Sequence, residues 1–372
     1  MITIKGRLGY SYILKKTANI FSIENSSLLE VAKIKGNGRF FILIDKEVYR
    51  IYGEKIRNYF YKHGIKIKIY IMEGGDYSKN QQCYLDVFKE LCLFDPLRKD
   101  EPLLAIGGGV ITDLGGFVAS TYRRGIPHIK IPTTLMGYVD ASVGIKTGIN
   151  FGPYKNRMGS FTIPSGVILD KTFLRTLDKR NIISGIGEII KLAVILDPTL
   201  FELLETGSKI LIENKFQNEL GEIILDRSIE KMVDELSGNL YETILKRKVD
   251  FGHTFSLMLE SASNYEMMHG EAVALDILYS CCISNLRGLL KEKDLDRILM
   301  LYKNFDMPIW SLHLNSKHLW TSVKERIIHR NGRQLIPIPV GIGRCKFIND
   351  LCLEEIQPAI DILKEYSLAL AV

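Results

Sequence analysis

The chain has 372 residues, of which 46% are hydrophobic and 25% are charged, and it carries a net charge of +6 at pH 7. This length is too great for one small core and suits two domains, and the composition is that of an ordinary globular protein. The lysines are scattered instead of forming a basic tail, so we expect an anionic small-molecule substrate and no nucleic-acid partner.

Signals for export or membrane insertion are not evident in the sequence. The segment Met1–Lys5 has no apolar signal core, and no run of about 18 apolar residues occurs. The six cysteines form no CxxC motif and no regular framework, which predicts reduced thiols. We therefore expect a cytoplasmic protein with no membrane-spanning segment.

The first quarter of the chain alternates strand-like and helix-like segments. Residues 1–25 alternate apolar and polar side chains and predict edge strands. The apolar run Arg39–Asp45 predicts a buried parallel strand with Asp45 at its carboxyl end, where sheets of this kind bind ligands. A helical stretch to about His63 and a second strand, Ile65–Met72, follow. This alternation predicts a doubly wound parallel sheet.

A glycine turn follows the next strand. Pro102–Ile106 is typical of a strand, Gly107–Gly109 of a turn and Val110–Phe117 of the start of a helix. Glycine N–H groups at an electropositive helix N-terminus can approach a pyrophosphate closely. The pattern is not the usual GxGxxG dinucleotide fingerprint, so a glycine turn that serves only packing is an open alternative.

Cationic residues gather after a further strand, Ile129–Thr134, which a proline interrupts. Lys146, Lys155 and Arg157 could form a phosphate cradle, because each can donate charge-assisted hydrogen bonds to an anion. We expect residues 152–159, which are rich in glycine, lysine and asparagine, to form a loop. A solvated surface loop without a ligand is the alternative.

The pattern changes near the middle of the chain. From about Asp178 onward, helical periodicity marks segments such as Leu200–Glu213 and Leu220–Leu236. No strong strand follows in this half of the chain until Gln334–Val340. We therefore expect an α/β Rossmann-like domain over residues 1–178 and a mostly α-helical domain over residues 179–372.

Three residues of the second domain form a candidate metal site, namely Glu188, His253 and His269. One carboxylate oxygen and two imidazole nitrogens are the ligands of a catalytic zinc that keeps a fourth position open. The two histidines are too far apart in sequence for one helical face, so we expect two packed helices that each present one histidine. The alternative is that both are ordinary polar residues.

Several motifs, in order along the chain, resemble the dehydroquinate synthase-like sugar phosphate cyclases. They are GGGVITDLGGFVAS, the RRG at 123–125, PTTLMGYVDASVGIKTGIN, KNRMGSF, GIGEIIK, DFGHTFS and HGEAVA. The resemblance runs from about Asp45 to Asp276 and more weakly beyond. It implies an N-terminal α/β domain that binds NAD, a C-terminal helical domain with a zinc site, and a homodimer.

The resemblance also implies roles for individual residues. It assigns the metal to Glu188, His253 and His269. The positions that it places around NAD are Asp45, Asp76, Lys79, Gly108, Gly109, Asp113, Thr133, Thr134, Asp140, Lys155 and Thr176. The positions that it places at the substrate are Lys146, Asn156 and Lys191, together with Arg124, which would reach the substrate phosphate from the neighbouring subunit.

Departures from the true dehydroquinate synthases decide the subfamily. Asp250 stands where those enzymes have an asparagine, and Leu257 stands where they have a second histidine. Met232 stands at the position of a lysine that pairs with the substrate carboxylate, and Lys246 stands at or next to the position of its arginine partner. A methionine cannot donate to a carboxylate, and burying that group with half its partners missing would cost several kcal/mol.

These departures indicate a substrate without a carboxylate. The chain resembles the sedoheptulose 7-phosphate cyclases, especially the 2-epi-5-epi-valiolone synthases. Asp250 would accept hydrogen bonds from the hydroxyls of a neutral sugar end, and it joins Lys146, Asn156 and Lys191 as a candidate catalytic residue. Arg330, in the segment HRNGR, is a candidate phosphate ligand.

The implied reaction converts a phosphorylated seven-carbon sugar to a cyclitol. Zinc polarises a hydroxyl from whose carbon NAD removes a hydride, phosphate is eliminated, the hydride returns, and an intramolecular aldol addition closes the ring. The product would be 2-epi-5-epi-valiolone or a relative such as desmethyl-4-deoxygadusol, and cobalt could replace zinc. The alternatives are 3-dehydroquinate synthase, against which Met232 and Leu257 argue, and a metal- and NAD-dependent polyol dehydrogenase.

Overall fold

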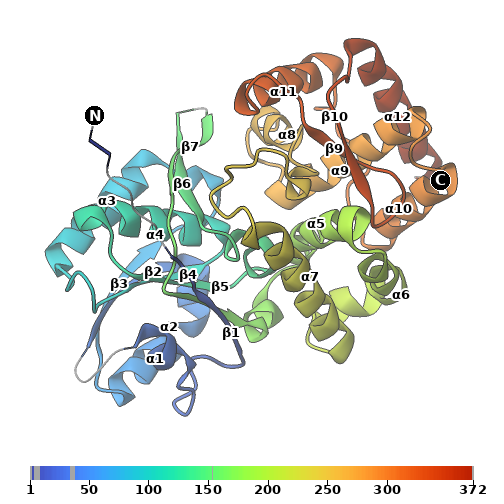
Figure 1. The fold of residues 1–372 in the computed structure, drawn as a ribbon. Helices are drawn as coiled ribbons and strands as arrows, with labels where there is room; N and C mark the ends of the chain where they lie inside the picture. The colour runs from blue at the N-terminus through green and yellow to red at the C-terminus, as the bar shows by residue number, and fades with distance from the viewer. Residues whose placement is uncertain (1, 4–8, 34–37, 153, 371–372) are drawn as a thin grey trace. The chain divides into compact units, whose positions relative to one another are not determined.

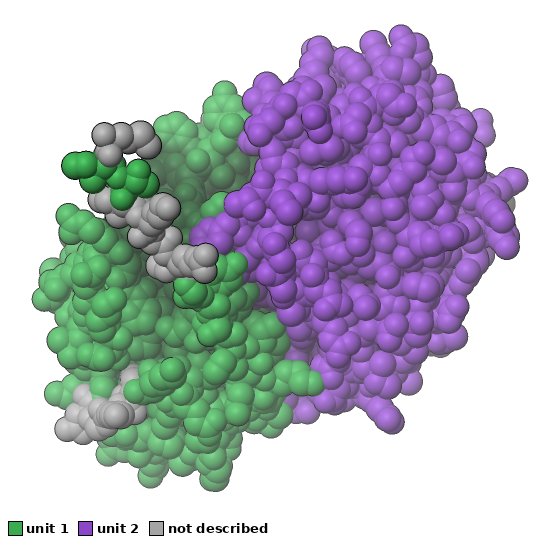
Figure 2. Space-filling view, in the orientation of Figure 1, with its two compact units in different colours: residues 1–133, 145–170 green, residues 134–144, 171–372 purple. Residues whose placement is uncertain are grey.

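The computed structural model describes residues 2–3, 9–33, 38–152 and 154–370. The chain divides into two compact units, which Figure 2 colours separately. Unit 1 comprises residues 1–133 and 145–170, and unit 2 comprises residues 134–144 and 171–372.

Unit 1 is built on a parallel sheet with helices on both faces. Its described elements are β1 (Ile13–Thr17), α1 (Ser27–Ala32), β2 (Arg39–Asp45), α2 (Lys46–Lys62), β3 (Lys66–Met72), η1 (Asp76–Ser78), α3 (Gln81–Phe94), β4 (Leu103–Gly107), α4 (Gly109–Thr121), η2 (Tyr122–Arg124), β5 (His128–Pro132), β6 (Lys146–Phe151), β7 (Tyr154–Phe161) and β8 (Gly166–Asp170). Within the described part of the chain, the main sheet has the order β1-β8-β5-β4-β2-β3 with every neighbouring pair parallel. Helices α1 and α2 cover one face, and α3 and α4 cover the other (Figure 1). The predicted doubly wound sheet is confirmed.

The strand order reverses at β2, where a doubly wound sheet is expected to bind its ligand. The chain moves from β2 to β3 on one side of it and later to β4 on the other side. Ligands of open α/β sheets bind outside the carboxyl ends of the strands at such a reversal. Asp45 ends β2 there, as predicted, and caps α2 by accepting hydrogen bonds from the N–H groups of Glu47 and Val48 at 2.8 and 3.2 Å.

A β-hairpin replaces the loop that we predicted for residues 152–159. Strands β6 and β7 pair antiparallel from Lys146 opposite Phe161 onward. Gly159, one of the glycines that indicated a loop, instead lets the two backbones approach, since a Cβ there would lie 2.4 Å from the Thr147 carbonyl oxygen. Residue 153 lies outside the described residues. Of the edge strands expected within residues 1–25, β1 is present, and residues 1 and 4–8 also lie outside the description.

Unit 2 is mostly helical, as predicted. Its described elements are η3 (Gly137–Ala141), η4 (Lys171–Thr176), α5 (Lys179–Leu196), α6 (Pro198–Asn214), α7 (Glu219–Ser237), η5 (Lys248–Asp250), α8 (Ser256–Ala262), α9 (His269–Leu286), α10 (Glu292–Asn304), α11 (Ser316–His329), β9 (Ile336–Pro339), β10 (Cys345–Ile348), η6 (Leu353–Glu355) and α12 (Ile356–Leu370). Strand β9 pairs antiparallel with β10. None of the helices in the described ranges is long and apolar enough to cross a membrane.

The division between the units differs from the predicted boundary at residue 178. Unit 2 begins again at Lys171, and it also contains the earlier segment 134–144. That segment belongs there because Asp140 forms an ion pair with Lys191 of α5 at 2.5 Å. A contact between residues so distant in sequence leaves no mark on the local sequence pattern.

Helices α5 and α9 cross in close contact because small residues meet at the crossing. A Cβ on Gly270 would lie 1.9 Å from the Ser184 carbonyl oxygen, and a Cβ on Gly187 would lie 2.6 Å from the Gly270 carbonyl oxygen. The Gly270 N–H also donates to the Ser184 hydroxyl at 3.2 Å. Any larger residue would hold the two helices apart.

Replacing Gly187 with alanine should destabilise unit 2, because the new methyl group would meet backbone atoms that cannot rotate away. We expect the free energy of unfolding to fall by about 1–3 kcal/mol, the usual cost of overpacking. Urea unfolding measures it. The matched control is Gly238→Ala, where a Cβ has no neighbour within 4 Å. Equal losses in the two variants would contradict the role assigned to the crossing.

Candidate metal centre

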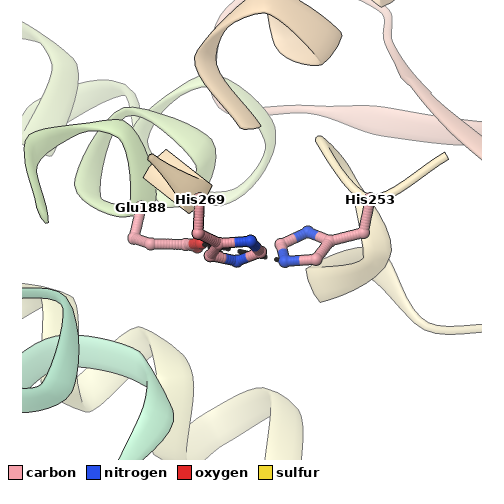
Figure 3. Close-up of side chains that lie close together, drawn as sticks. All are labelled: Glu188, His253 and His269. Atoms are coloured by element: carbon pink, nitrogen blue, oxygen red, sulfur yellow. Dashed lines mark ion pairs between the residues drawn. The ribbon is translucent and has the colours of Figure 1, made fainter. Parts of the chain in front are cut away.

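Glu188, His253 and His269 come together in unit 2, with their side chains directed toward one another (Figure 3). Oε1 of Glu188 lies 3.7 Å from Nε2 of His253 and 3.3 Å from Nε2 of His269. The three ligand atoms all lie within 4.8 Å of one another. Glu188 belongs to α5, and His269 is the first residue of α9. The prediction that each histidine lies on a helix is wrong for His253, which lies in the turn between η5 and α8.

The residues present fit a zinc ion. Nδ1 of His269 lies 3.0 Å from Oε1 of the buried Glu260, and Nδ1 of His253 lies 3.1 Å from the Phe251 carbonyl oxygen. These partners hold a proton on each Nδ1 and leave the lone pair of each Nε2 for a metal. With the Glu188 carboxylate, the two nitrogens make the donor set of a catalytic zinc site with an open position.

The charged groups around the three ligands shift the pKa values of those ligands in different directions. Burial alone would raise the pKa of Glu188, but Lys191 and the two imidazoles hold it well below the usual value. Burial lowers the pKa of His253 to about 3. Burial opposes charge on His269 too, yet Glu260 and Glu188 raise its pKa to about 10. A metal at Nε2 would take the place of that proton.

Lys191 is a fully buried cation beside the metal ligands. Its Nζ lies 2.5 Å from Oδ2 of Asp140 and 2.5 Å from Oε2 of Glu188. Burial alone would lower the pKa of Lys191, but these two carboxylates raise it above its ordinary value. Asp140 lies in η3, a single π-helical turn, a feature that often marks functional positions. The predicted substrate residue Lys191 and the predicted NAD residue Asp140 are therefore direct partners.

Asp250 is surrounded by guanidinium groups. Arg330 donates to Oδ2 at 2.5 Å and Arg326 at 3.4 Å, while Arg247 donates to Oδ1 through Nε at 3.0 Å and through Nη2. Burial alone would raise the pKa of Asp250, but the three arginines hold it far below the usual range. The candidate phosphate ligand Arg330 is thus bound to the candidate catalytic residue Asp250. Both oxygens of that carboxylate are engaged.

The structure shows the surroundings of Met232 and Lys246, two residues that depart from the synthase pattern. Met232 of α7 is 1% exposed and belongs to the core of unit 2. Lys246 is exposed, and its ammonium lies 5.0 Å from the centre of the Phe347 ring. The neighbouring Arg247 turns inward and is held by Asp250 and by Glu242.

In unit 1, four predicted residues form two ion pairs. Nζ of Lys79 lies 2.6 Å from Oδ2 of Asp113, and Nζ of Lys155 lies 3.2 Å from Oδ2 of Asp76. Lys79 also donates to Oδ1 of Asn156 at 2.7 Å. The structure therefore brings predicted NAD residues of η1, α4 and β7 into one network.

The other predicted positions are more dispersed. Gly108 caps α4, Gly109 is its first residue, and Thr133 follows β5, with its N–H bound to the Gly107 carbonyl oxygen at 3.0 Å. Lys146 is exposed at the start of β6, and Arg124 is exposed beyond the C-terminal end of α4, away from the glycine turn. In unit 2, Thr134 precedes η3 and Thr176 ends η4.

Sequence reasoning missed several residues that organise these sites. Glu260 orients His269, and Arg247 and Arg326 hold Asp250. Asn150 of β6 accepts the Asn156 N–H at 3.0 Å and donates to the Asp76 carbonyl oxygen at 3.4 Å. Glu260 and Arg326 lie within helices, Asn150 lies on a strand and Arg247 lies in a loop, and none of these local settings identifies the partner of its residue.

Comparison with known proteins defines first the class and then the family. Residues 69–184 match the 3-dehydroquinate synthase N-terminal family model, and residues 185–325 match the 3-dehydroquinate synthase C-terminal model. Together with the parallel sheet of unit 1 and the helical unit 2, these matches define a dehydroquinate synthase-like enzyme of two parts.

Relatives that match nearly the whole chain narrow this class. A 2-epi-5-epi-valiolone synthase of Streptomyces albus is 40% identical over 95% of this chain and 88% of its own length. A demethyl-4-deoxygadusol synthase of Trichormus variabilis is 36% identical over 97% and 90%. The structure of ValA, a 2-epi-5-epi-valiolone synthase of Streptomyces hygroscopicus with NAD+ and Zn2+ bound, matches with a TM-score of 0.94 and 35% identity over 98% and 99%. The chain belongs to the dehydroquinate synthase-like sugar phosphate cyclases, as its motifs predicted.

Replacing Glu260 with glutamine should weaken zinc binding, because His269 would lose the carboxylate that fixes its ring and raises its basicity. We expect the dissociation constant for zinc to rise about 10–100-fold, as is usual for partners of metal-bound histidines. Competition with a chromophoric chelator measures it. The control is Glu266→Gln, the same change at an exposed position nearby. An unchanged affinity would show that Glu260 does not support the site.

Replacing Asp250 with asparagine should destabilise the protein, because buried arginines would lose their counter-ion. At pH 7 we expect the free energy of unfolding to fall by about 3–5 kcal/mol, as when one partner of a buried ion pair is removed. The depressed pKa of Asp250 in the folded state sets the sign of the pH dependence. The difference between wild type and variant should be full above about pH 4 and should shrink as the pH falls below that value. A difference that grows with acidity would contradict this.

Proposed function

We propose that the chain is an NAD- and zinc-dependent sugar phosphate cyclase. It converts sedoheptulose 7-phosphate to 2-epi-5-epi-valiolone or a close cyclitol. The observation that carries the choice of substrate is the burial of Met232 in the core of unit 2. By the family resemblance, Met232 stands at the position of the lysine that binds the substrate carboxylate in dehydroquinate synthases. A methionine has no donor for a substrate carboxylate, so a carboxylated substrate would lose that partner here.

The metal centre would serve the oxidation and reduction of the sugar. Zinc, or cobalt, held by Glu188, His253 and His269 would polarise a substrate hydroxyl in the open coordination position, while NAD would accept the hydride and return it. The names of the relatives support both cofactors, since ValA carries NAD+ and Zn2+. NAD would bind at the crevice beside Asp45 and the glycine turn, where N–H groups of α4 are available to a pyrophosphate.

Lys191 is the residue best suited to stabilise negative charge. Its ammonium is buried, stays protonated and lies beside a metal ligand, so it can donate to an oxygen that gains charge as its carbon reacts. Lys146 and Asn156 would contact the substrate, and Arg330 its phosphate. Asp250 would hold Arg330 in place and accept a hydrogen bond from a substrate hydroxyl.

The functional assembly in this proposal is a homodimer. Arg124 is exposed at the end of α4 opposite the glycine turn, and a helix of 13 residues spans about 20 Å. It is therefore poorly placed to serve the crevice of its own unit. It would instead reach the substrate phosphate of the neighbouring subunit.

Inorganic phosphate release tests the proposed function. Protein supplied with NAD and zinc should release phosphate from sedoheptulose 7-phosphate, with no accumulation of NADH, and should leave the carboxylated heptulosonate substrate of dehydroquinate synthase intact. Lys191→Met is the control for the site, and we expect it to lower the rate by about 100-fold or more, the loss typical of a group that stabilises transition-state charge.

Each alternative has its own outcome in this assay. Release from the carboxylated sugar would identify a 3-dehydroquinate synthase and would show that Met232 does not exclude a carboxylate. Accumulation of NADH without phosphate release would identify a polyol dehydrogenase. Proton NMR of the product then separates 2-epi-5-epi-valiolone from a deoxygadusol.

A further inference from the structure

A buried carboxylate of α9, Asp276, is bonded to the segment that carries His253. The side chain of Asp276 has no exposed surface. Its Oδ2 accepts the N–H groups of Phe255 at 2.5 Å and Ser256 at 3.0 Å, and its Oδ1 accepts the Ser280 hydroxyl at 3.2 Å. None of these contacts involves a residue to which a role has been assigned.

One face of α9 carries both His269 and Asp276. Asp276 lies seven positions after His269, which is nearly two full turns, so their side chains project on the same side of the helix about 10 Å apart. The helix thus presents a metal ligand at its first residue and, two turns later, an acceptor for the segment that supplies another metal ligand.

The two N–H groups that Asp276 accepts lie at the start of α8. Such groups have no partner within their own helix, and an acidic side chain is a favourable acceptor for them. His253 lies two residues before Phe255, so fixing Phe255 limits where the His253 ring can be. The residue before His253 is also packed closely on α9, since a Cβ on Gly252, which has φ of +75°, would lie 2.9 Å from Val273 and 3.0 Å from Ile277.

Helix α8 also supports the other histidine. Glu260 belongs to α8, about one turn after Ser256, and its Oε1 lies 3.0 Å from Nδ1 of His269. A shift of α8 would therefore move His253 and disturb the partner of His269 together. Asp276, which accepts the N–H groups at the start of α8, therefore affects the positions of both His253 and His269.

Packing alone does not account for an acid at this position. Burying a carboxylate costs free energy that an apolar side chain of similar size would not, and Asp is rarely buried completely. Burial raises the pKa of Asp276 to about 6 even though the two backbone N–H groups and Ser280 oppose the rise. What an acid supplies here, and a leucine cannot, is an acceptor for the two N–H groups of α8.

We propose that Asp276 is a positioning residue of the metal centre, which holds the start of α8 so that His253 and Glu260 are placed for zinc. The inference rests on the proposed function for the metal site itself. It concerns zinc affinity and geometry, and it assigns Asp276 no contact with substrate.

Three variants test it by zinc titration of the metal-free protein and by the visible spectrum of the Co2+-loaded protein. Asp276→Leu removes the acceptor, and we expect the dissociation constant for zinc to rise about 10–100-fold with an altered cobalt spectrum. Asp276→Asn keeps a weaker, uncharged acceptor, so its affinity should lie between those of wild type and the leucine variant. Ser284→Ala, which removes a buried bond from α9 to the Pro339 carbonyl oxygen, should lower the melting temperature without changing zinc affinity.

The results separate the inference from the proposed function. Zinc binding within about twofold of wild type in Asp276→Leu overturns the inference, and if that variant does not fold, the same result in Asp276→Asn overturns it. A loss of affinity in Ser284→Ala as large as in Asp276→Leu also overturns it, because general instability would then explain both. Wild-type protein that binds no zinc overturns the proposed metal site as well.

Discussion

The close crossing of α5 and α9 is the constraint on which the metal centre depends. Gly187 and Gly270 allow the two backbones to meet, and each stands next to a metal-ligand candidate, Glu188 on α5 and His269 on α9. The positions of these two ligands are therefore set by backbone contact between their helices. Because Lys191 lies one turn after Glu188 on α5, the same crossing also fixes the buried cation beside the site.

Unit 2 contains two buried clusters of charged side chains, one with more negative charge and the other with more positive charge. Around Lys191, one ammonium faces the carboxylates of Glu188 and Asp140, and this leaves negative charge that suits a divalent cation. Around Asp250, three guanidinium groups within the described residues face a carboxylate, with Glu242 beside Arg247, and this leaves positive charge that suits an anionic substrate. Burial makes either excess costly when no ligand is present, so both clusters favour the bound state.

Local sequence patterns predicted the elements that depend on interactions between residues close together in the sequence. The apolar run of β2, the glycine turn before α4 and the helical periodicity of unit 2 were all readable. The set Glu188, His253 and His269 was predicted from its ligand types, and the family resemblance assigned the same three residues. What the sequence did not reveal depends on distant partners. The turn at His253 lies where we expected a helix, and the β6–β7 hairpin is rich in glycine. The arginines around Asp250 come from two segments about 80 residues apart.

The segment 134–144 has a consequence for how the protein is made. It is synthesised between β5 and β6, yet its partners, α5 and α7, leave the ribosome only after β8 has completed the sheet. During synthesis the nascent chain must therefore carry Leu135 and Asp140 unpaired until Gly185 and Lys191 have emerged. Unit 1 can therefore complete its sheet as soon as β8 is made. Unit 2 cannot fold until both of its segments, which residues 145–170 separate in the sequence, have been synthesised.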